Sequence, residues 1–237
     1  GIVYAPDGTL WTVNTLNNAR FLVLKKWCLL RGGNPLEYVY NDRFFDIANT
    51  VYTIANTPAI FAAIIAQAYH PKSAVDVGCG IGLYLKELKA RGVDILGIDG
   101  SPAAARNLVI SSDAFLLHDI TERLFLPRRF DCALCFEVAE HIPHDKSGIL
   151  IDNLVRLSDI VFFTAAPKGQ GGHDHINEQD PQFWVTLFQK RGFEFLAEDT
   201  KKMRKALGDA GAIFWLVDNI AVFRRRSTDP LIVASRR

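Results

Sequence analysis

The sequence predicts an α/β protein with a doubly wound, mainly parallel, seven-stranded sheet. From Ser73 onward, short apolar runs alternate with segments of helical periodicity at the spacing of strand–helix–strand units. The 237 residues, 49% of them hydrophobic, are enough to bury the core of one such domain. Residues 1–72 lack this alternation. We therefore expect a helical N-terminal extension or cap over residues 1–72 and the sheet domain over residues 73–237.

The expected elements follow one another along the chain. Apolar runs predict strands at Ser73–Val77, Asp94–Ile98, Asp113–Leu117, Phe130–Phe136, Asp159–Ala165, Phe193–Glu198 and Ile220–Arg224. Helices are expected at Gly82–Arg91, Pro102–Ile110, Ile149–Leu157 and Pro181–Arg191. In the extension, periodicity predicts helices over Trp11–Leu30 and Phe44–Tyr69, the second broken at Pro58.

Charge and cysteine usage narrow the functional class. Lys and Arg (27) nearly balance Asp and Glu (26), so nothing indicates the basic surface that nucleic acid would need. The chain has no run of about 18 apolar residues and no signal-peptide layout at its N-terminus, so we expect a cytoplasmic protein without a membrane span. Cys132 and Cys135 have CxxC spacing but lie in a predicted strand, where residues three apart face opposite ways. They are expected to be buried core cysteines rather than a redox or zinc pair.

The segment Ala74-Val-Asp-Val-Gly-Cys-Gly-Ile-Gly82 carries the most specific functional signal. A strand ends, glycines follow and a helix begins, which lets a ligand approach the backbone closely. A dinucleotide fingerprint would need a third glycine where this chain has Leu83. Asp76, at the end of the strand, would also repel a pyrophosphate on the helix N-terminus. A carboxylate there suits the amino group and the sulfonium of S-adenosylmethionine, and the same two residues argue against a nicotinamide oxidoreductase.

Further acidic residues follow the next strands. Asp99 comes after the second strand, close to the ~20 residues expected for a carboxylate that binds ribose. Asp119 follows the third strand and Glu137 the fourth. Because a ligand crevice lies at the carboxyl ends of the strands in such a sheet, we expect all four acids at one edge.

Residues 73–143 resemble the core of the class I S-adenosylmethionine-dependent methyltransferases, in the branch whose fourth strand ends in Glu-Val-x-Glu-His. Here that motif is Glu137-Val-Ala-Glu140-His141, and the resemblance extends more loosely to about residue 225. It implies a Rossmann-like fold with S-adenosylmethionine as the cofactor. The residues that the resemblance assigns to the cofactor are Asp76, Gly78, Gly80 and Gly82 at the methionine end, Asp99 with Gly100 at the ribose, Asp119 and Ile120 at the adenine, and Phe136 and Glu137 on the other side.

The acceptor of the methyl group is less clearly indicated. Methyl transfer needs alignment and exclusion of water, and it needs a general base when the acceptor is a hydroxyl. Histidines follow the fourth and fifth strands, and we expect His141 and His175 to be the catalytic residues. The loop 167–179 resembles methyltransferases of glycan and secondary-metabolite clusters, which favours a small-molecule or sugar hydroxyl. Aromatic residues at positions 38, 40, 44, 45 and 52 could cap this pocket, although packing of helices on the sheet explains most of them equally well.

Two other functions stay open. Small-RNA 3′-end methyltransferases, and some quinone-biosynthetic O-methyltransferases, have a Glu-x-x-Glu-His set that can hold a divalent metal. Here it would comprise Glu137, Glu140, His141 and either His175 or His173. Many metal-free relatives share the set, so the sequence assigns no metal. One alternative is therefore a metal-dependent RNA 2′-O-methyltransferase, against which the balanced charge argues. The other is a non-catalytic cofactor-binding subunit. The sequence predicts neither the acceptor nor the oligomeric state.

Overall fold

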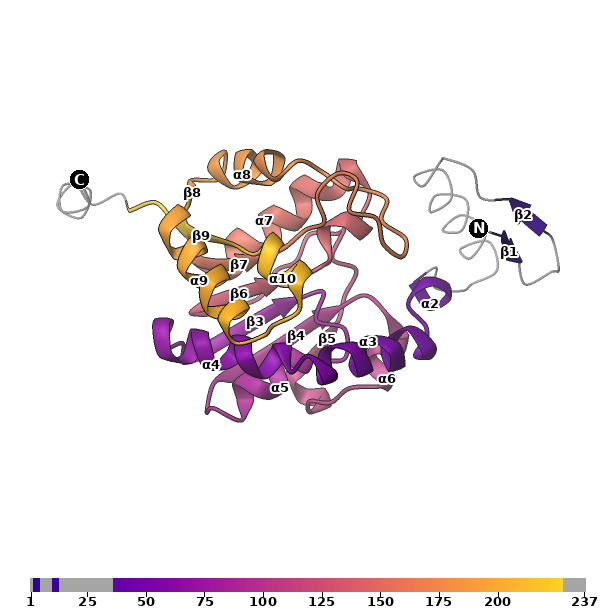
Figure 1. Ribbon diagram of the computed structural model, residues 1–237, viewed down its shortest axis with the longest axis horizontal. Coiled ribbons are helices and arrows are strands. Elements are labelled where there is room, and N and C mark those ends of the chain that lie inside the picture. The colour runs from indigo at the N-terminus through magenta and orange to yellow at the C-terminus, as the bar shows by residue number, and fades with distance from the viewer. Residues whose placement is uncertain (1, 5–9, 13–35, 228–237) are drawn as a thin grey trace.

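The computed structural model describes residues 2–4, 10–12 and 36–227, and its centre is a seven-stranded sheet (Figure 1). The strands are β3 (Ser73–Val77), β4 (Asp94–Asp99), β5 (Phe115–Leu117), β6 (Cys132–Cys135), β7 (Ile160–Phe163), β8 (Phe193–Phe195) and β9 (Ala221–Arg225). Their order across the sheet is β5-β4-β3-β6-β7-β9-β8. Of the seven, only β9 runs antiparallel to its neighbours. The predicted doubly wound, mainly parallel sheet is confirmed.

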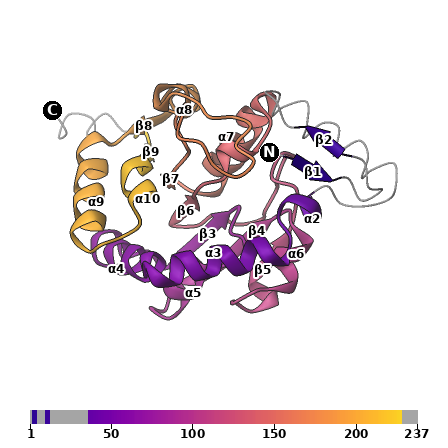
Figure 2. The same cartoon turned by 45° about the vertical axis from the view of Figure 1, so that its right-hand side comes forward.

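Helices cover both faces of the sheet, as Figures 1 and 2 show. One face carries α4 (Thr57–Tyr69), α5 (Leu83–Lys89), α9 (Ala197–Asp209) and α10 (Phe214–Asn219). The other carries α7 (Ser147–Leu157) and α8 (Pro181–Gln189). Near β5, α3 (Asp42–Ile54) packs on α6 (Pro102–Arg106), and α2 (Leu36–Val39) precedes them. Short 3₁₀ helices lie at Ser112–Ala114, Ala139–His141 and His144–Lys146, and β1 (Ile2–Tyr4) pairs with β2 (Leu10–Thr12).

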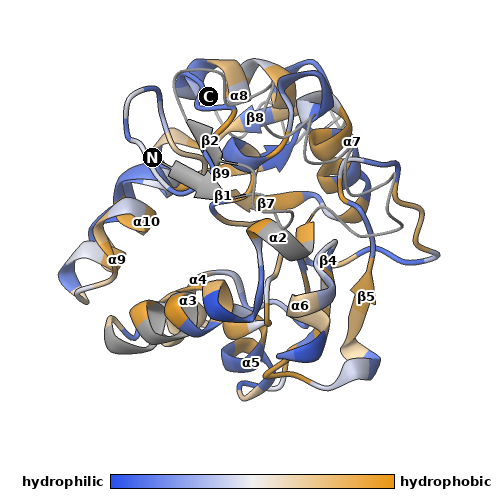
Figure 3. Cartoon of the chain, turned by 90° about the vertical axis from the view of Figure 1, so that its right-hand side faces the viewer, coloured by the Kyte–Doolittle hydropathy of each residue, from blue (hydrophilic) through white to orange (hydrophobic). Residues whose placement is uncertain are grey.

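The central strands are buried on both faces, which explains why they appear in the sequence as continuous apolar runs. In β6, Cys132 and Leu134 face the core under α4 and α5, whereas Ala133 and Cys135 face the core under α7 and α8. Figure 3 shows this layering as apolar strands between helices whose outer sides are hydrophilic. Both strand cysteines are buried free thiols on opposite faces, which confirms the prediction made for them.

The helices after residue 196 are not predicted from the sequence. α9 is strongly polar and buries only Thr200, Met203 and Leu207. These three residues form a narrow stripe, whereas hydrophobic periodicity detects helices that have a broad apolar face. Because α9 begins at Ala197, β8 ends earlier than expected. The break in the extension comes at Asn56, in a left-handed conformation (φ 50°), while Pro58 lies in the first turn of α4, where proline is tolerated.

The N-terminal part is described only in segments. Trp11 lies in β2, so the helix predicted from Trp11 is wrong at its start, and residues 13–30 lie outside the described residues. α3 and α4 confirm helical structure over most of Phe44–Tyr69, and the fully buried Phe61 of α4 packs directly on the sheet. The division into an extension over 1–72 and a domain over 73–237 stays a prediction. None of the helices described has the length and apolar character of a membrane span.

Candidate active site

The glycine turn brings the ends of β3 and β4 together. The amides of Gly78 and Cys79 both donate to the carbonyl of Ile98, at 2.7 and 3.1 Å. The carboxylate of Asp99 accepts the Gly80 amide through Oδ2 and the Ser101 amide through Oδ1, each at 2.8 Å. The turn that follows β3 is therefore fixed directly to the carboxylate that follows β4, as expected if both line one crevice.

Asp76 is a buried carboxyl beside this turn. Its side chain is only 2% exposed, and burial, reinforced by the negative charge of Asp99, raises its pKa from 3.8 to about 7. Burial also raises the pKa of Asp99, against the opposing effect of the amides of Ser101, Gly80 and Gly100. Two neighbouring buried acids with raised pKa values favour a cationic ligand, because a positive charge would offset the cost of ionising them.

Two glycines of the turn are required by geometry. Gly78 has φ 81°, and a Cβ there would lie 2.4 Å from a methyl group of Val138. Gly80 has φ 54°, and a Cβ there would lie 3.2 Å from the ring of Phe45. Side chains at these positions would be strained in the backbone and would also meet atoms already in place.

At the end of β5, Asp119 binds its own turn by accepting the amide and hydroxyl of Thr121 at 2.9 and 2.7 Å. The next residues are held by Asn153 of α7, which is 2% exposed. Its amide group donates to the carbonyls of Ile120 and Glu122, and its oxygen accepts the amide of Leu124. Sequence reasoning missed Asn153. The available signal was a polar residue on the inward face of an apolar helix.

Aromatic residues from the N-terminal part cover the turn. Phe45 is buried against Gly80, and the Tyr40 carbonyl accepts the hydroxyl of Ser101 at 3.0 Å. The Tyr40 ring lies edge-on to His141, with centroids 5.7 Å apart. Burial, together with the nearby acids Asp174, Glu140 and Asp99, raises the pKa of Tyr40 well above its usual value. Of the five aromatic residues named from the sequence, these and Phe44 have described side chains, and they lie at the predicted edge.

Phe136 and Glu137 are neighbours with different surroundings. The Phe136 ring is enclosed by Phe61 and Tyr84, with both centroids 4.9 Å away, so it packs in the core under α4 and α5. Glu137 has φ 54°, an uncommon conformation for a non-glycine residue, and its amide donates to the Thr164 hydroxyl at 2.8 Å. The chain therefore turns sharply here, and the predicted contacts of both side chains with a cofactor stay predictions.

Glu140 is a fully buried carboxyl within the Glu-Val-x-Glu-His motif. Among the described residues, neither of its oxygens has a hydrogen-bond partner of normal geometry. Burial, followed by the charge of Glu137, raises its pKa well above the usual value. A buried carboxyl without partners is costly, so this geometry favours a proton or a cation on Glu140.

Two histidines lie beside Glu140. The rings of His141 and His175 are 4.9 Å apart, and the three side chains offer ligand atoms within 4.8 Å of one another. His141 Nδ1 lies 3.3 Å from the Asp174 carbonyl, which can only accept, so Nδ1 carries the proton and Nε2 the lone pair. Burial, followed by the charge of His175, lowers the pKa of His141 to about 3. His173 is 64% exposed on its side chain and pairs with Asp174, outside this group.

The donor set fits a divalent metal in its chemistry, with one carboxylate and two neutral imidazoles. Glu137, the fourth residue expected from the sequence, has its Oε1 3.5 Å from the Asn219 side chain and interacts with Glu140, although it is not among the three whose ligand atoms lie within 4.8 Å of one another. The structure thus brings together three of the four candidate ligands, and of the two alternative histidines it places His175, not His173, in the group.

Comparison with known proteins shows which family part of the chain matches. Residues 55–159 match the family described as a methyltransferase domain, a range that contains the glycine turn and the motif from Glu137 to His141. This part of the chain therefore matches a methyltransferase domain. The match begins at residue 55, so it includes α4 of the predicted extension.

Solved structures share the fold of this methyltransferase domain. Magnesium protoporphyrin IX methyltransferase from Synechocystis, with bound S-adenosylhomocysteine, superposes with a TM-score of 0.59 at 16% identity, over 81% of this chain and 98% of that one. A plantazolicin methyltransferase, in complex with a monoazolic desmethylPZN analogue and S-adenosylhomocysteine, superposes with a TM-score of 0.57 at 14% identity, over 89% of this chain and 96% of that one.

Curated relatives match a shorter stretch. The ubiquinone biosynthesis O-methyltransferase of Nitrosomonas europaea is 34% identical over 101 residues, 39% of this chain and 43% of the relative. The mitochondrial enzyme of the same name from Schizosaccharomyces pombe is 25% identical over 130 residues, 52% of this chain and 43% of the relative. The chain thus spans less than half the length of these relatives.

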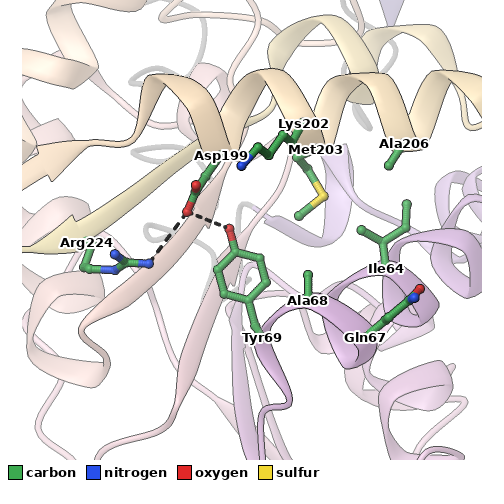
Figure 4. A pocket seen from close by; sticks show the side chains of 9 residues that line it. All are labelled: Ile64, Gln67, Ala68, Tyr69, Asp199, Lys202, Met203, Ala206 and Arg224. Carbon is green, nitrogen blue, oxygen red and sulfur yellow. Dashed lines mark hydrogen bonds and ion pairs between the residues drawn. The ribbon is translucent and has the colours of Figure 1, made fainter. Parts of the chain in front are cut away.

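A hollow lies between α4 and α9, lined also by Arg224 of β9 (Figure 4). Its volume is about 450 Å³. Its main polar groups bind one another, because Asp199 accepts the Tyr69 hydroxyl at 3.3 Å and pairs with Arg224 at 3.6 Å. The network ties α4 to α9 and β9.

Proposed function

We propose that this methyltransferase domain transfers the methyl group of S-adenosylmethionine to a hydroxyl of a small molecule. The observation that carries the proposal is the position of two imidazoles, His141 and His175, beside buried Glu140 at the same sheet edge as Asp76 and Asp99. The names of the curated relatives, O-methyltransferases of ubiquinone biosynthesis, support a hydroxyl acceptor. Their modest identity does not select one.

In this proposal the cofactor lies across the carboxyl ends of β3, β4 and β5. Asp76 binds the ammonium of the methionine part beside Gly78, Gly80 and Gly82, where the backbone approaches most closely. Asp99 uses the remaining lone pairs of its oxygens for the ribose hydroxyls, with Gly100 alongside. Asp119 and Ile120 face the adenine, held from behind by Asn153. Phe136 and Glu137 complete the assignment.

A hydroxyl acceptor must lose its proton, and the two histidines differ in their fitness to take it. With a pKa of about 3, His141 is a weak base at neutral pH and is better suited to accept a hydrogen bond through Nε2. His175, paired with Glu178, is the better candidate for the general base. The half-buried ring of Tyr40 and the buried ring of Phe45 help to exclude water from the transfer.

A second candidate is a metal-dependent form of the same reaction, favoured by the buried carboxyl of Glu140 close to the two imidazoles. Glu140, His141 and His175 would then hold a divalent cation, which lowers the pKa of a bound hydroxyl. An RNA 2′-hydroxyl would be a further acceptor for this form, against which the net charge of +1 argues.

The test is transfer of radiolabelled methyl from S-adenosylmethionine to separate panels of phenols, sugars and short RNAs, each with chelator or with added Mg²⁺, Mn²⁺ or Zn²⁺. We expect transfer to a phenol or sugar hydroxyl, abolished in His175→Ala and retained in the control His70→Asn. His70 is exposed, lies at the other edge, and has a left-handed conformation that asparagine tolerates. Activity lost with chelator selects the metal-dependent form. Tight S-adenosylhomocysteine binding without transfer to any acceptor would instead indicate a cofactor-binding subunit.

A further inference from the structure

The loop between β7 and α8 contains a carboxylate with several partners. Glu178 Oε1 lies 2.9 Å from His175 Nδ1 and accepts the Gly171 amide at 2.7 Å, while its Oε2 accepts the Gly169 amide at 2.8 Å. The side chains of His175 and Glu178 are only 11% and 18% exposed. Because the loop donates to both oxygens, the carboxylate is held in one orientation relative to the imidazole.

We infer that Glu178 is a positioning residue that fixes the tautomer and the direction of the His175 ring. A carboxylate at this distance accepts a hydrogen bond from Nδ1–H, so in the neutral imidazole the lone pair lies on Nε2. Glu178 acts through His175, because both of its oxygens are already engaged by His175 and the loop amides. The inference rests on the proposed function only in giving His175 a part in methyl transfer.

The opposite edge of the same ring is fixed by the backbone. A Cβ at Gly172 would lie 2.2 Å from His175 Nε2, so only glycine permits the ring to occupy this position. The next residues are bound to the motif after β6, since the amides of Ile176 and Asn177 both donate to the Glu140 carbonyl at 2.9 Å. The Glu178 contact therefore orients His175 on a segment that is already attached beside Glu140 and His141.

The tautomer can be measured without an acceptor, by long-range ¹H–¹⁵N correlation of protein labelled at its six histidines, at a pH where the ring is neutral. The His175 signals are assigned by their absence in His175→Gln. We expect the Nδ1–H form in the wild type and a shift toward Nε2–H in Glu178→Ala. Glu178→Gln keeps an oxygen that can accept from Nδ1, so it should retain more of the Nδ1–H form. An Nε2–H wild type, or a tautomer unchanged in Glu178→Ala, overturns the inference.

Kinetics separate positioning from a structural role. We expect Glu178→Ala to lower kcat on the order of 10–100-fold, as for other carboxylates that orient a histidine, with S-adenosylhomocysteine affinity unchanged. The double variant Glu178→Ala/His175→Ala should then be no slower than His175→Ala alone. Glu198→Gln, an exposed carboxylate at the start of α9, is the matched control. Additive losses overturn the inference. Full activity of His175→Ala would count against the proposed base, while the tautomer measurement would still decide the role of Glu178.

Discussion

The buried carboxyl of Asp76 is expected to reduce stability in exchange for cofactor binding. In the unfolded chain this group ionises near its ordinary pKa, whereas burial raises the folded pKa from 3.8 to about 7. Below pH 4 both states hold the proton and the shift has no effect. Between pH 4 and 7 the unfolded state ionises first, so the folded state loses stability as the pH rises. The full loss above pH 7 is roughly 4 kcal/mol in the free energy of unfolding.

Asp76→Asn has no proton to lose at this position. Without cofactor, we expect it to match the wild type near pH 4 and to exceed it by up to roughly 4 kcal/mol at pH 8. The assay is urea unfolding followed by circular dichroism at intervals between these values. The control Asp209→Asn removes an exposed carboxyl on α9 and leaves the buried one in place, so it should not reproduce the gain expected for Asp76→Asn. If Asp76→Asn were no more stable at pH 8 than at pH 4, relative to the wild type, the burial argument would be refuted.

The same substitution should weaken binding of S-adenosylhomocysteine, which retains the ammonium group. Loss of a charge-assisted hydrogen bond costs about 1.5–3 kcal/mol, or roughly 10–150-fold in Kd. Because the ligand needs the ionised carboxylate, wild-type affinity should rise with pH through 7, and that dependence should vanish in Asp76→Asn. Titration calorimetry at pH 6 and pH 8 measures both effects.

Three further predictions concern the framework. Gly78→Ala should destabilise the protein by more than Gly192→Ala. Both glycines have positive φ, but only at Gly78 would the new methyl group lie within 3 Å of a side chain. Chemical unfolding of the two variants isolates the free-energy cost of that clash. Asn153→Ala should cost about 2–4 kcal/mol in the free energy of unfolding and weaken cofactor binding, since it leaves buried backbone groups unpaired. Burial and the charge of Asp199 raise the pKa of Tyr69 to about 12. The wild type should therefore lose stability relative to Tyr69→Phe as the pH rises from 10 to 12, because the unfolded state ionises first. Thermal unfolding at these pH values measures the difference.

Local sequence patterns were sufficient to predict the sheet and the glycine turn. β3 has its predicted bounds because its apolar run stops abruptly at glycines that need positive φ, and these signals lie within a few residues of each other. α9 was missed for the converse reason. Its three buried residues make a stripe too narrow for periodicity to detect, and only packing on α4 and β9 supplies the rest of its stability.

The positions of the site residues could be predicted only where the parallel strands of the sheet determine them. Asp76 and Asp99 could be placed at one edge because parallel strands share their carboxyl ends. The contact between Asn219 and Glu137 joins residues 82 positions apart, and no local sequence pattern predicts it. Whether His173 or His175 faces Glu140 likewise depends on which hydrogen bonds the loop forms. The sequence shows the donors and acceptors of the loop but not how they pair.

We propose that the glycine turn, Asp76 and Asp99 form a site for S-adenosylmethionine. The most direct measurement is calorimetric titration of the chain with S-adenosylhomocysteine and, separately, with NAD. We expect binding of one S-adenosylhomocysteine per chain, strongly weakened in Asp99→Ala, and no heat from NAD. Binding of NAD without binding of S-adenosylhomocysteine would contradict it.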